Sequence, residues 1–320
     1  MLIKSTQFKQ PTNRLILGIW LAVGLFFYFV ASVTLNSYRE TLSRGQYDAI
    51  AQARLIAEHA STTIDSADMA LLTAKDVLID DDMVAGIQLA TARRESINSS
   101  LKGIQSRVRG VVSISVTNAD GIVFTNSLGV APGISLASRD YFKAVKTQTQ
   151  NAPVISEAIL GRVSNKWGIQ VARRLEFKDG RFAGMLVANL GLAESFDAFY
   201  ESLTKGTHDA VALYDVESRL ISRFPRADQL IGKQLPRNSV SDAFRNLTPE
   251  GCIEQASLVD GQVRLFGFRQ VPRYPFYALV APLKADVMSG WTRERNLNLL
   301  YAAMALVAGL YLTHLIRKGE

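Results

Sequence analysis

Residues 114–127 read ISVTNADGIVFTNS, and residues 211–224 read VALYDVESRLISRF. Each stretch has an apolar strand, a polar turn and a second apolar strand, and the Asp120-Gly121 pair in the first is a strong signal for a β-hairpin. The two stretches lie nearly a hundred residues apart. A repeat of that length predicts two tandem globular modules and not a solenoid of short units.

Further matching segments follow each hairpin in the same order. A Gly-x-x-Leu motif is present at residues 133–136 (GISL) and again at residues 232–235 (GKQL). Each half then ends in an apolar strand, at residues 185–190 (MLVANL) and 277–283 (YALVAPL). We therefore expect two small antiparallel sheets with flanking helices, one in residues 111–204 and the other in residues 205–290.

A helical stripe precedes the two modules, in a segment predicted to be helical from residue 36 to residue 110. Apolar or small residues recur at alternating spacings of three and four, which is the pattern of one helix face: Ile50, Ala53, Ala57, Ala60, Ile64, Ala67, Leu71, Ala74 and Leu78. This face packs either on its own domain or against a second copy. The three aspartates at residues 80–82 allow a calcium site as one hypothesis, but three adjacent carboxylates are expected to form a solvated helix start. A second helix is expected to follow them and to reach about Arg109.

Two long apolar stretches without a charge bracket the chain, at residues 15–35 (LILGIWLAVGLFFYFVASVTL) and 297–316 (LNLLYAAMALVAGLYLTHLI). Each is long enough to cross a hydrocarbon core of about 30 Å as a helix. A cleaved signal peptide is the alternative for the first, but a signal core has about 7–15 residues. Two transmembrane helices in contact with membrane lipid are therefore predicted.

Basic residues near the ends of spans tend to stay in the cytoplasm. Lys4, Lys9 and Arg14 precede the first stretch, and Arg317 and Lys318 follow the second. Residues 1–14 and 317–320 are thus expected to be cytoplasmic tails, and the large middle part is expected to be periplasmic. The predicted location is a bacterial inner membrane, crossed more than once.

Composition excludes several classes of function. The formal net charge of +7 falls close to balance once the basic tails are set aside, so nucleic-acid binding has no electrostatic support. Cys252 is the only cysteine, so no disulfide can form within the chain. The three histidines, at 59, 208 and 314, have no metal-ligand spacing, and no phosphate loop or nucleophile elbow is present. We expect no metal, no cofactor and no enzymatic activity.

Taken in order, these segments resemble the double Cache sensor of bacterial transmembrane receptors, most closely those of diguanylate cyclases and histidine kinases. The resemblance covers about residues 36–290 and is carried by VTNADGIVFTNS, SRDYFKAV, WGIQVARRL with DGRFAGMLVANL, ALYDVESRLISRFP and YPFYALVAPL. It implies an α+β fold with a long N-terminal helix and two tandem PAS-like antiparallel-sheet modules, flanked by two transmembrane helices. In such receptors the membrane-distal module, here residues 111–204, usually holds the ligand, and residues 205–290 would be the membrane-proximal module.

The segment Arg139-Asp140-Tyr141-Phe142 matches the Arg-x-aromatic-aromatic element of this family. A guanidinium offers a planar fork of donors for a carboxylate, and neighbouring rings exclude water. In amino-acid-binding members, a Tyr-x-Asp element and a strand aspartate hold the ligand amine. Here the corresponding positions are Ile159-x-Gly161 and Asn189, so both carboxylates are missing and an amino-acid ligand is not expected.

The site hypothesis is a small anion, such as an organic acid, held in the distal module by Arg139 with help from Arg162 or Arg173. Arg173 alternates with its neighbours so that it shares a strand face with Trp167. The predicted site residues are Arg139, Tyr141, Phe142, Arg162, Trp167, Arg173 and Asn189. The alternatives are that Arg139 caps a helix or pairs with a surface acid, that the aromatic residues are core, and that Arg162 is only exposed.

The function predicted from these features is a homodimeric sensor that transmits ligand binding across the inner membrane. Its output would come from a cytoplasmic domain beyond Glu320 or from a separate partner protein. The alternatives are a membrane-anchored scaffold that binds another protein without a small ligand, and an anchored hydrolase.

Overall fold

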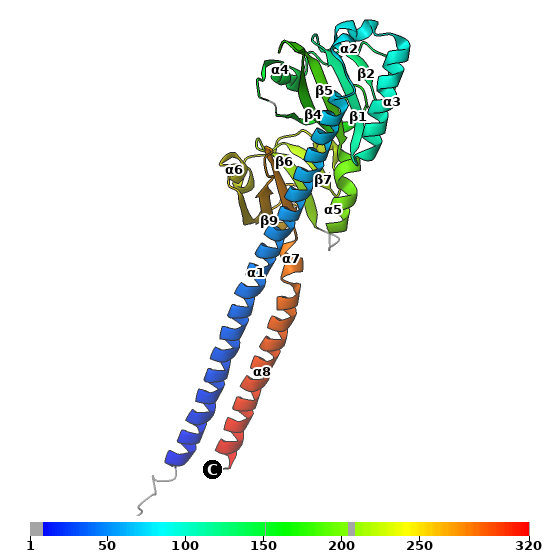
Figure 1. Ribbon diagram of the computed structural model, residues 1–320. Coiled ribbons are helices and arrows are strands. Elements are labelled where there is room, and N and C mark those ends of the chain that lie inside the picture. Colours follow the sequence, from blue (N-terminus) through cyan, green and yellow to red (C-terminus); the bar gives the residue numbers. More distant parts are fainter. Residues whose placement is uncertain (1–8, 151, 204–208, 320) are drawn as a thin grey trace, which may run out of the picture. The chain divides into compact units, whose positions relative to one another are not determined.

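The computed structural model describes residues 9–150, 152–203 and 209–319 and divides into two compact units (Figure 1). One unit comprises residues 48–282, and the other comprises the chain up to residue 47 and from residue 283 onward. Helix α1 (Lys9–Lys75) is continuous through the boundary between them.

The second of these units is a pair of helices, the first part of α1 and α8 (Ser289–Lys318), with the short α7 (Lys284–Val287) before α8. The ring of Trp291 meets the Tyr38 ring edge-on at 5.0 Å, and its Nε1 donates to the Thr34 carbonyl at 3.1 Å. Further along, a Cβ on Gly309 would lie 3.2 Å from Val23. Residue numbers that rise along α8 therefore contact residue numbers that fall along α1, so the two helices run antiparallel.

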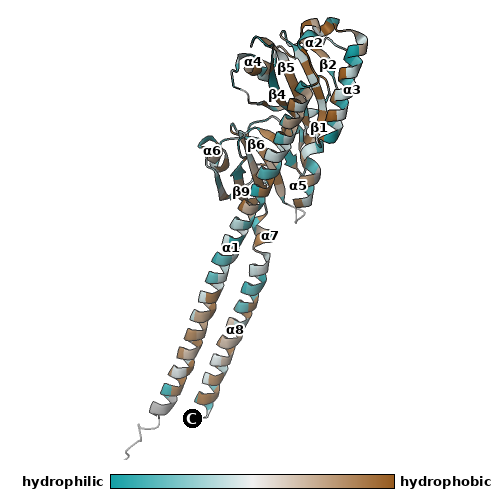
Figure 2. Ribbon diagram, viewed as in Figure 1, coloured by the Kyte–Doolittle hydropathy of each residue, from teal (hydrophilic) through white to brown (hydrophobic). Residues whose placement is uncertain are grey.

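Both helices of this pair contain a stretch long and apolar enough to cross a membrane. Figure 2 shows apolar residues along α8 and the first part of α1. Large apolar side chains point outward from the pair, among them Leu17, Leu25, Leu299 and Leu310. An outward apolar surface of this length is costly in water, so it fits the predicted spans.

The unit of residues 48–282 contains two five-stranded antiparallel sheets with the same strand order. The first sheet has the order β2-β1-β5-β4-β3, and the second has the order β7-β6-β10-β9-β8. The strands are β1 (Val111–Asn118), β2 (Val123–Asn126), β3 (Val154–Leu160), β4 (Trp167–Glu176), β5 (Phe182–Gly191), β6 (Ala210–Asp215), β7 (Leu220–Phe224), β8 (Glu250–Ala256), β9 (Val263–Gln270) and β10 (Phe276–Ala281). The predicted α+β class and the predicted repeat are confirmed.

Both sheets start with a hairpin closed by an acidic or amide side chain. Asn118 Oδ1 accepts from the backbone amides of Asp120 at 3.1 Å and Ile122 at 2.9 Å, and Gly121 takes a φ of +77°. In the second hairpin, Asp215 Oδ1 accepts from the backbone amide of Arg219 at 2.7 Å. The polar turns that mark the repeat in the sequence therefore have the same structural role.

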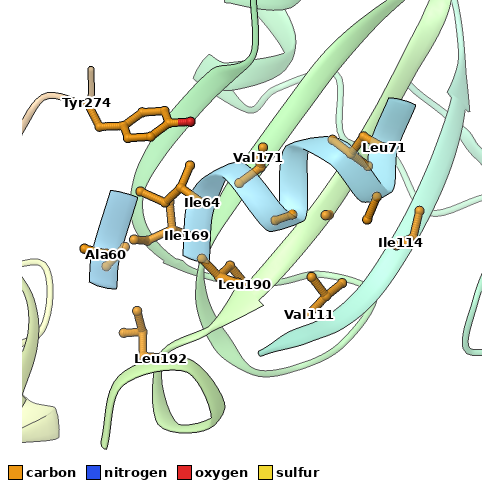
Figure 3. Packing of buried hydrophobic residues seen from close by; sticks show 14 of the residues in the cluster. Ala60, Ile64, Leu71, Val111, Ile114, Ile169, Val171, Leu190, Leu192 and Tyr274 are labelled. Carbon is orange, nitrogen blue, oxygen red and sulfur yellow. The ribbon is translucent and has the colours of Figure 1, made fainter. Parts of the chain in front are cut away.

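The predicted stripe of α1 forms the centre of the core. Its residues from Ala53 to Ala74 are fully buried. Figure 3 shows Ala60, Ile64 and Leu71 directed at strand residues of the first sheet. The many alanines let the helix approach the strands closely. Because the chain's own sheets cover this stripe, a second copy cannot pack on it.

One further helix, reaching about Arg109, was predicted after α1, whereas the structure has two, and the first is only six residues long. They are α2 (Asp80–Ala85), followed by a 3-10 turn η1 (Gly86–Gln88), and α3 (Thr91–Arg107). The prediction of a solvated start is wrong for Asp82, which is buried and bonds Arg93 Nη2 at 2.6 Å. Burial alone would raise the pKa of Asp82, but hydrogen bonds from Arg93 and from the Ile79 amide hold it below its ordinary value. Among the described residues, no cluster of three or more potential metal ligands exists.

The link between the two sheets packs on α1. It consists of a π-helical turn η2 (Ala193–Asp197) and the helix α5 (Ala198–Leu203). The imidazole of His59 stacks on the Phe199 ring with centroids 3.9 Å apart. Burial, followed by repulsion from Arg109, lowers the pKa of His59.

This histidine is expected to make the unit less stable in mild acid. Because its folded pKa lies below the unfolded value of about 6.5, the unfolded state binds more protons, and stability falls as pH drops through about 6.5 toward the folded pKa. Chemical denaturation at pH 7.5 and pH 5.5 should therefore give a smaller free energy of unfolding at pH 5.5. His59→Phe should reduce that difference. An unchanged difference in the variant would contradict the assignment.

Candidate ligand site

The candidate site lies on the face of the first sheet that α1 leaves free. Along the strands, Ile114, Ile169 and Leu190 face α1, and the residues between them face the other way. There α4 (Asp140–Thr147) covers the sheet (Figure 1). The buried polar residues on this second face include Ser113, Ser115, Gln170 and Asn189. Polar residues at the centre of a sheet need partners, so this face is the natural place for a polar ligand.

Two arginines form hydrogen bonds between the end of β3 and the residues at and before the start of α4. Arg139 is the residue at the N-cap position of α4, and its Nη2 donates to the Leu160 carbonyl at the end of β3, at 2.9 Å. Arg162, just after β3, donates through Nη1 to the Ser135 carbonyl at 2.5 Å and through Nη2 to Ser138 Oγ at 3.2 Å. Within the described part of the chain, the Arg139 side chain thus neither caps α4 nor pairs with an acid, which were the alternatives for it.

An open cleft and a small interior pocket adjoin at these arginines. The cleft has a volume of about 560 Å³ and is lined by Arg139, Tyr141 and Arg162. The interior pocket, of about 10 Å³, reaches Gln170 and Asn189, and Tyr141 and Arg162 line it as well. A space that small holds about one water molecule. A larger ligand can reach Asn189 only if Arg162 and its loop move outward.

Several polar atoms at this site have no partner. Among the described residues, no carboxylate lies within ion-pair distance of Arg139 or Arg162, whose acceptors are all neutral oxygens. Arg139 Nε, Gln170 Nε2 and Asn189 Oδ1 are buried without a hydrogen bond. Each such group costs about 1–3 kcal/mol when it is left unsatisfied. The site is therefore cationic, with donors and one acceptor free for a ligand.

Tyr141 adds a neutral hydroxyl to the cationic site. Burial raises the pKa of Tyr141 to about 12, although the nearby charges of Arg139 and Arg162 act in the opposite direction. The hydroxyl is therefore protonated at neutral pH and can donate to an anion or accept from an arginine.

Asn189 reaches the loop after β3 because glycines leave room for it. Its Nδ2 donates to Ser164 Oγ at 2.5 Å and to the Lys166 carbonyl at 3.2 Å. A Cβ on Gly161 would lie 2.5 Å from Asn189 Nδ2, and one on Gly168 would lie 1.7 Å from Asn189 Oδ1. Gly161 and Gly168 thus leave the space that the Asn189 amide fills.

The structure therefore brings together four of the seven predicted residues, Arg139, Tyr141, Arg162 and Asn189, and places the other three elsewhere. Phe142 packs in the core, edge-on to Phe182 at 5.9 Å. Trp167 is partly exposed at the start of β4. Arg173 is on the α1 side of β4, where it pairs with Asp68 of α1. Arg173 lies on this side because alternate residues of a strand point to opposite faces, and the odd-numbered residues of β4 face α1.

Sequence reasoning missed Gln170, Ser113, Ser115 and two residues of the cleft, Glu157 and Arg219. A signal existed for Gln170, which is a polar residue between the apolar residues Ile169 and Val171 of β4. It could not be interpreted from the sequence, because both faces of β4 are covered and the pattern does not say which face meets α1.

Comparisons with known proteins agree with this architecture. A family model described as a dCache_1-like histidine kinase sensor domain matches residues 193–281. Among solved structures, the extracellular domain titled as that of the histidine kinase rpHK1S-Z16 has a TM-score of 0.66 and 25% identity, over 78% of this chain and 99% of that chain. A search of curated protein sequences gave no match.

Two chemoreceptors of Campylobacter jejuni share the fold. The periplasmic sensory domain of Tlp1 has a TM-score of 0.59 and 11% identity, over 78% of this chain and 98% of that one. The sensory domain of Tlp3, solved with isoleucine bound, has a TM-score of 0.54 and 15% identity, over 80% of this chain and 97% of that one. The predicted resemblance is confirmed: residues 193–281 match the dCache_1-like sensor-domain model, and the two-sheet unit shares its fold with sensor domains of histidine kinases and chemoreceptors. The matches support an extracellular sensor role.

Proposed function

We propose that the chain senses a small carboxylate outside the cytoplasm and binds it in the cleft between α4 and β3. The observation that carries this proposal is the pair of guanidiniums, Arg139 and Arg162, that have only neutral oxygen acceptors in a cleft of about 560 Å³. A ligand carboxylate would replace those acceptors with a negatively charged group that can accept two parallel hydrogen bonds from one guanidinium, and such bidentate ion pairs are among the strong hydrogen bonds.

The same site argues for a ligand without an amino group. An ammonium needs a carboxylate or several free acceptors, and the two acids at the cleft are already engaged. Glu157 pairs with Arg219 at 2.8 Å, and Asp140 bonds Lys143 at 3.0 Å on the exposed side of α4. Tlp3 was solved with isoleucine bound, whereas in this chain the unpartnered acceptor at the site is the Asn189 amide oxygen.

Arg139→Ala is expected to raise the Kd for the bound carboxylate by about 10- to 150-fold, because a hydrogen bond to a charged group contributes about 1.5–3 kcal/mol. Isothermal titration calorimetry on the detergent-purified chain, with panels of carboxylates and amino acids, measures this. Arg181→Ala is the matched control, since Arg181 is exposed and pairs with Asp179 away from the cleft. Unchanged binding in Arg139→Ala would remove the site from consideration.

The antiparallel helix pair supports a topology for this sensor. It places Arg14 near the same end as Arg317 and Lys318, and basic residues at span ends favour the cytoplasmic side. In the proposal the two helices cross the inner membrane and the sheets lie in the periplasm. Helix α1 is continuous from the pair into the core of the sensor, so a ligand-dependent shift could pass along it.

The proposal includes a second copy of the chain and a cytoplasmic output. The face of α1 opposite the buried stripe exposes Leu55 and Met69, which offers a surface for a parallel helix of another protomer. No catalysis is assigned to this chain, and the response would come from a cytoplasmic domain or partner protein. Crosslinking of single cysteines introduced at Leu55 or Met69 tests the pairing.

A further inference from the structure

One cation in the cleft of the first module comes from the second sheet. Arg219 lies in the turn between β6 and β7, yet it lines the same cleft as Arg139 and Arg162. Its Nη1 bonds Glu157 Oε2 on β3 at 2.8 Å and Asp215 Oδ2 at 3.1 Å. A single guanidinium therefore connects the edge strand of the first sheet to the first hairpin of the second.

The position of Arg219 is fixed independently of Glu157. Its backbone amide donates to Asp215 Oδ1 at 2.7 Å, and its backbone pairs with Gln234 in an isolated bridge. Asp215 is itself buried. Losing the Glu157 contact would therefore leave Arg219 in place, held by its own hairpin.

Glu157 acts as an internal counter-ion in the cleft. The lining includes three arginines and two acids, and Asp140 is engaged with Lys143 on the outside of α4. Of the two lining acids, only Glu157 forms an ion pair with a lining arginine, among the residues that the structure describes. The pair is partly exposed, at 38% for Arg219 and 49% for Glu157, so it is weak and can be exchanged for a ligand group.

We propose that Arg219 belongs to the ligand site and makes it selective for anions with two acidic groups. One carboxylate of the ligand binds Arg139 and Arg162, and the other displaces Glu157 from Arg219. This inference rests on the proposed function, since it needs the first carboxylate in the cleft.

The exchange would carry information between the two sheets. In the free protein, the Glu157–Arg219 pair is a direct bond from the first module to the second. In the bound protein, the ligand takes the place of Glu157, so that β3 is released and the hairpin of Arg219 is tied to the ligand. A monocarboxylate would occupy the first position and leave the pair intact.

The test compares acids of equal length with one or two carboxylates on the full chain in detergent. Diacids from malonate to adipate are titrated calorimetrically beside the monocarboxylates of the same carbon number. The expected result is that one diacid binds at least tenfold more tightly than its monocarboxylate. Arg219→Gln should abolish that preference, so that the diacid and its monocarboxylate bind with similar dissociation constants. Glu157→Gln, which removes the competitor but keeps the shape, should tighten diacid binding several-fold.

Arg226→Gln is the matched control, because Arg226 is a paired arginine of the second module that does not line the cleft. If monocarboxylates bind in an Arg139-dependent way and diacids bind no better, the inference is wrong and the proposed function stands. Arg219→Gln weakening both classes equally would also overturn it. If no acid of either series binds, the proposed function fails and this inference fails with it.

Discussion

Arg173→Met is expected to lower the free energy of unfolding of the sensor region by about 3–5 kcal/mol, the range for breaking one side of a buried ion pair. Arg173 on β4 pairs with Asp68 on α1, with Nη2 2.8 Å from Oδ2 and a second contact through Nε. The two side chains are only 12% and 14% exposed. The substitution keeps the aliphatic volume and leaves the Asp68 carboxylate buried without its partner.

Urea denaturation of the chain in detergent, followed by circular dichroism of the sheets, measures this loss. The double variant Asp68→Leu with Arg173→Met should recover most of it, because the unpaired charge is then gone. Arg181→Met, on the exposed β4–β5 turn, should change stability little. A loss below about 1 kcal/mol in Arg173→Met would show that water reaches Asp68 and that the pair is not buried.

Gly267→Ala is expected to be the most damaging small substitution in the second sheet. A Cβ at Gly267 on β9 would lie 2.5–2.6 Å from the backbone carbonyl and the Cβ of Ala49 on α1. These atoms belong to backbone and a buried alanine, so no flexible side chain can yield. Overpacking of this kind costs about 1–3 kcal/mol and at times more, and the backbone clash puts this site at the upper end.

Thermal unfolding monitored by circular dichroism tests this substitution. Gly103→Ala is the matched control in α3, where nothing lies within 4 Å of the added Cβ. In a helix interior that change should stabilise by up to about 1 kcal/mol. The two glycine variants should therefore shift the melting temperature in opposite directions. An unchanged melting temperature in Gly267→Ala would mean that α1 does not approach β9 as closely as described.

The parts of the fold that the sequence predicted are those set by local chemistry. The Asp-Gly turn predicted the first hairpin, because the turn needs a residue with positive φ at Gly121. The spacing from Ala53 to Ala74 predicted the buried face of α1, because a helix returns to the same side every three to four residues. The repeat of these signals predicted two modules.

The candidate site was only partly predictable, because its remaining residues meet through tertiary structure. Arg139 and Tyr141 belong to one local motif, so they could be named together. The sequence of β4 does not show which of its faces meets α1. For that reason the prediction placed Arg173 at the site and left Gln170 out. Arg219 joins the cleft from the other sheet, and no spacing along the chain indicates that contact.

A crystal structure of the chain with a bound carboxylate tests the central claim most directly. We predict a ligand carboxylate within about 2.7–3.2 Å of the Arg139 or Arg162 guanidinium nitrogens, with the Arg162 bonds to Ser135 and Ser138 exchanged for the ligand. A ligand bound on the second sheet, with Arg139 still on the Leu160 carbonyl and Arg162 still on Ser135, would contradict it.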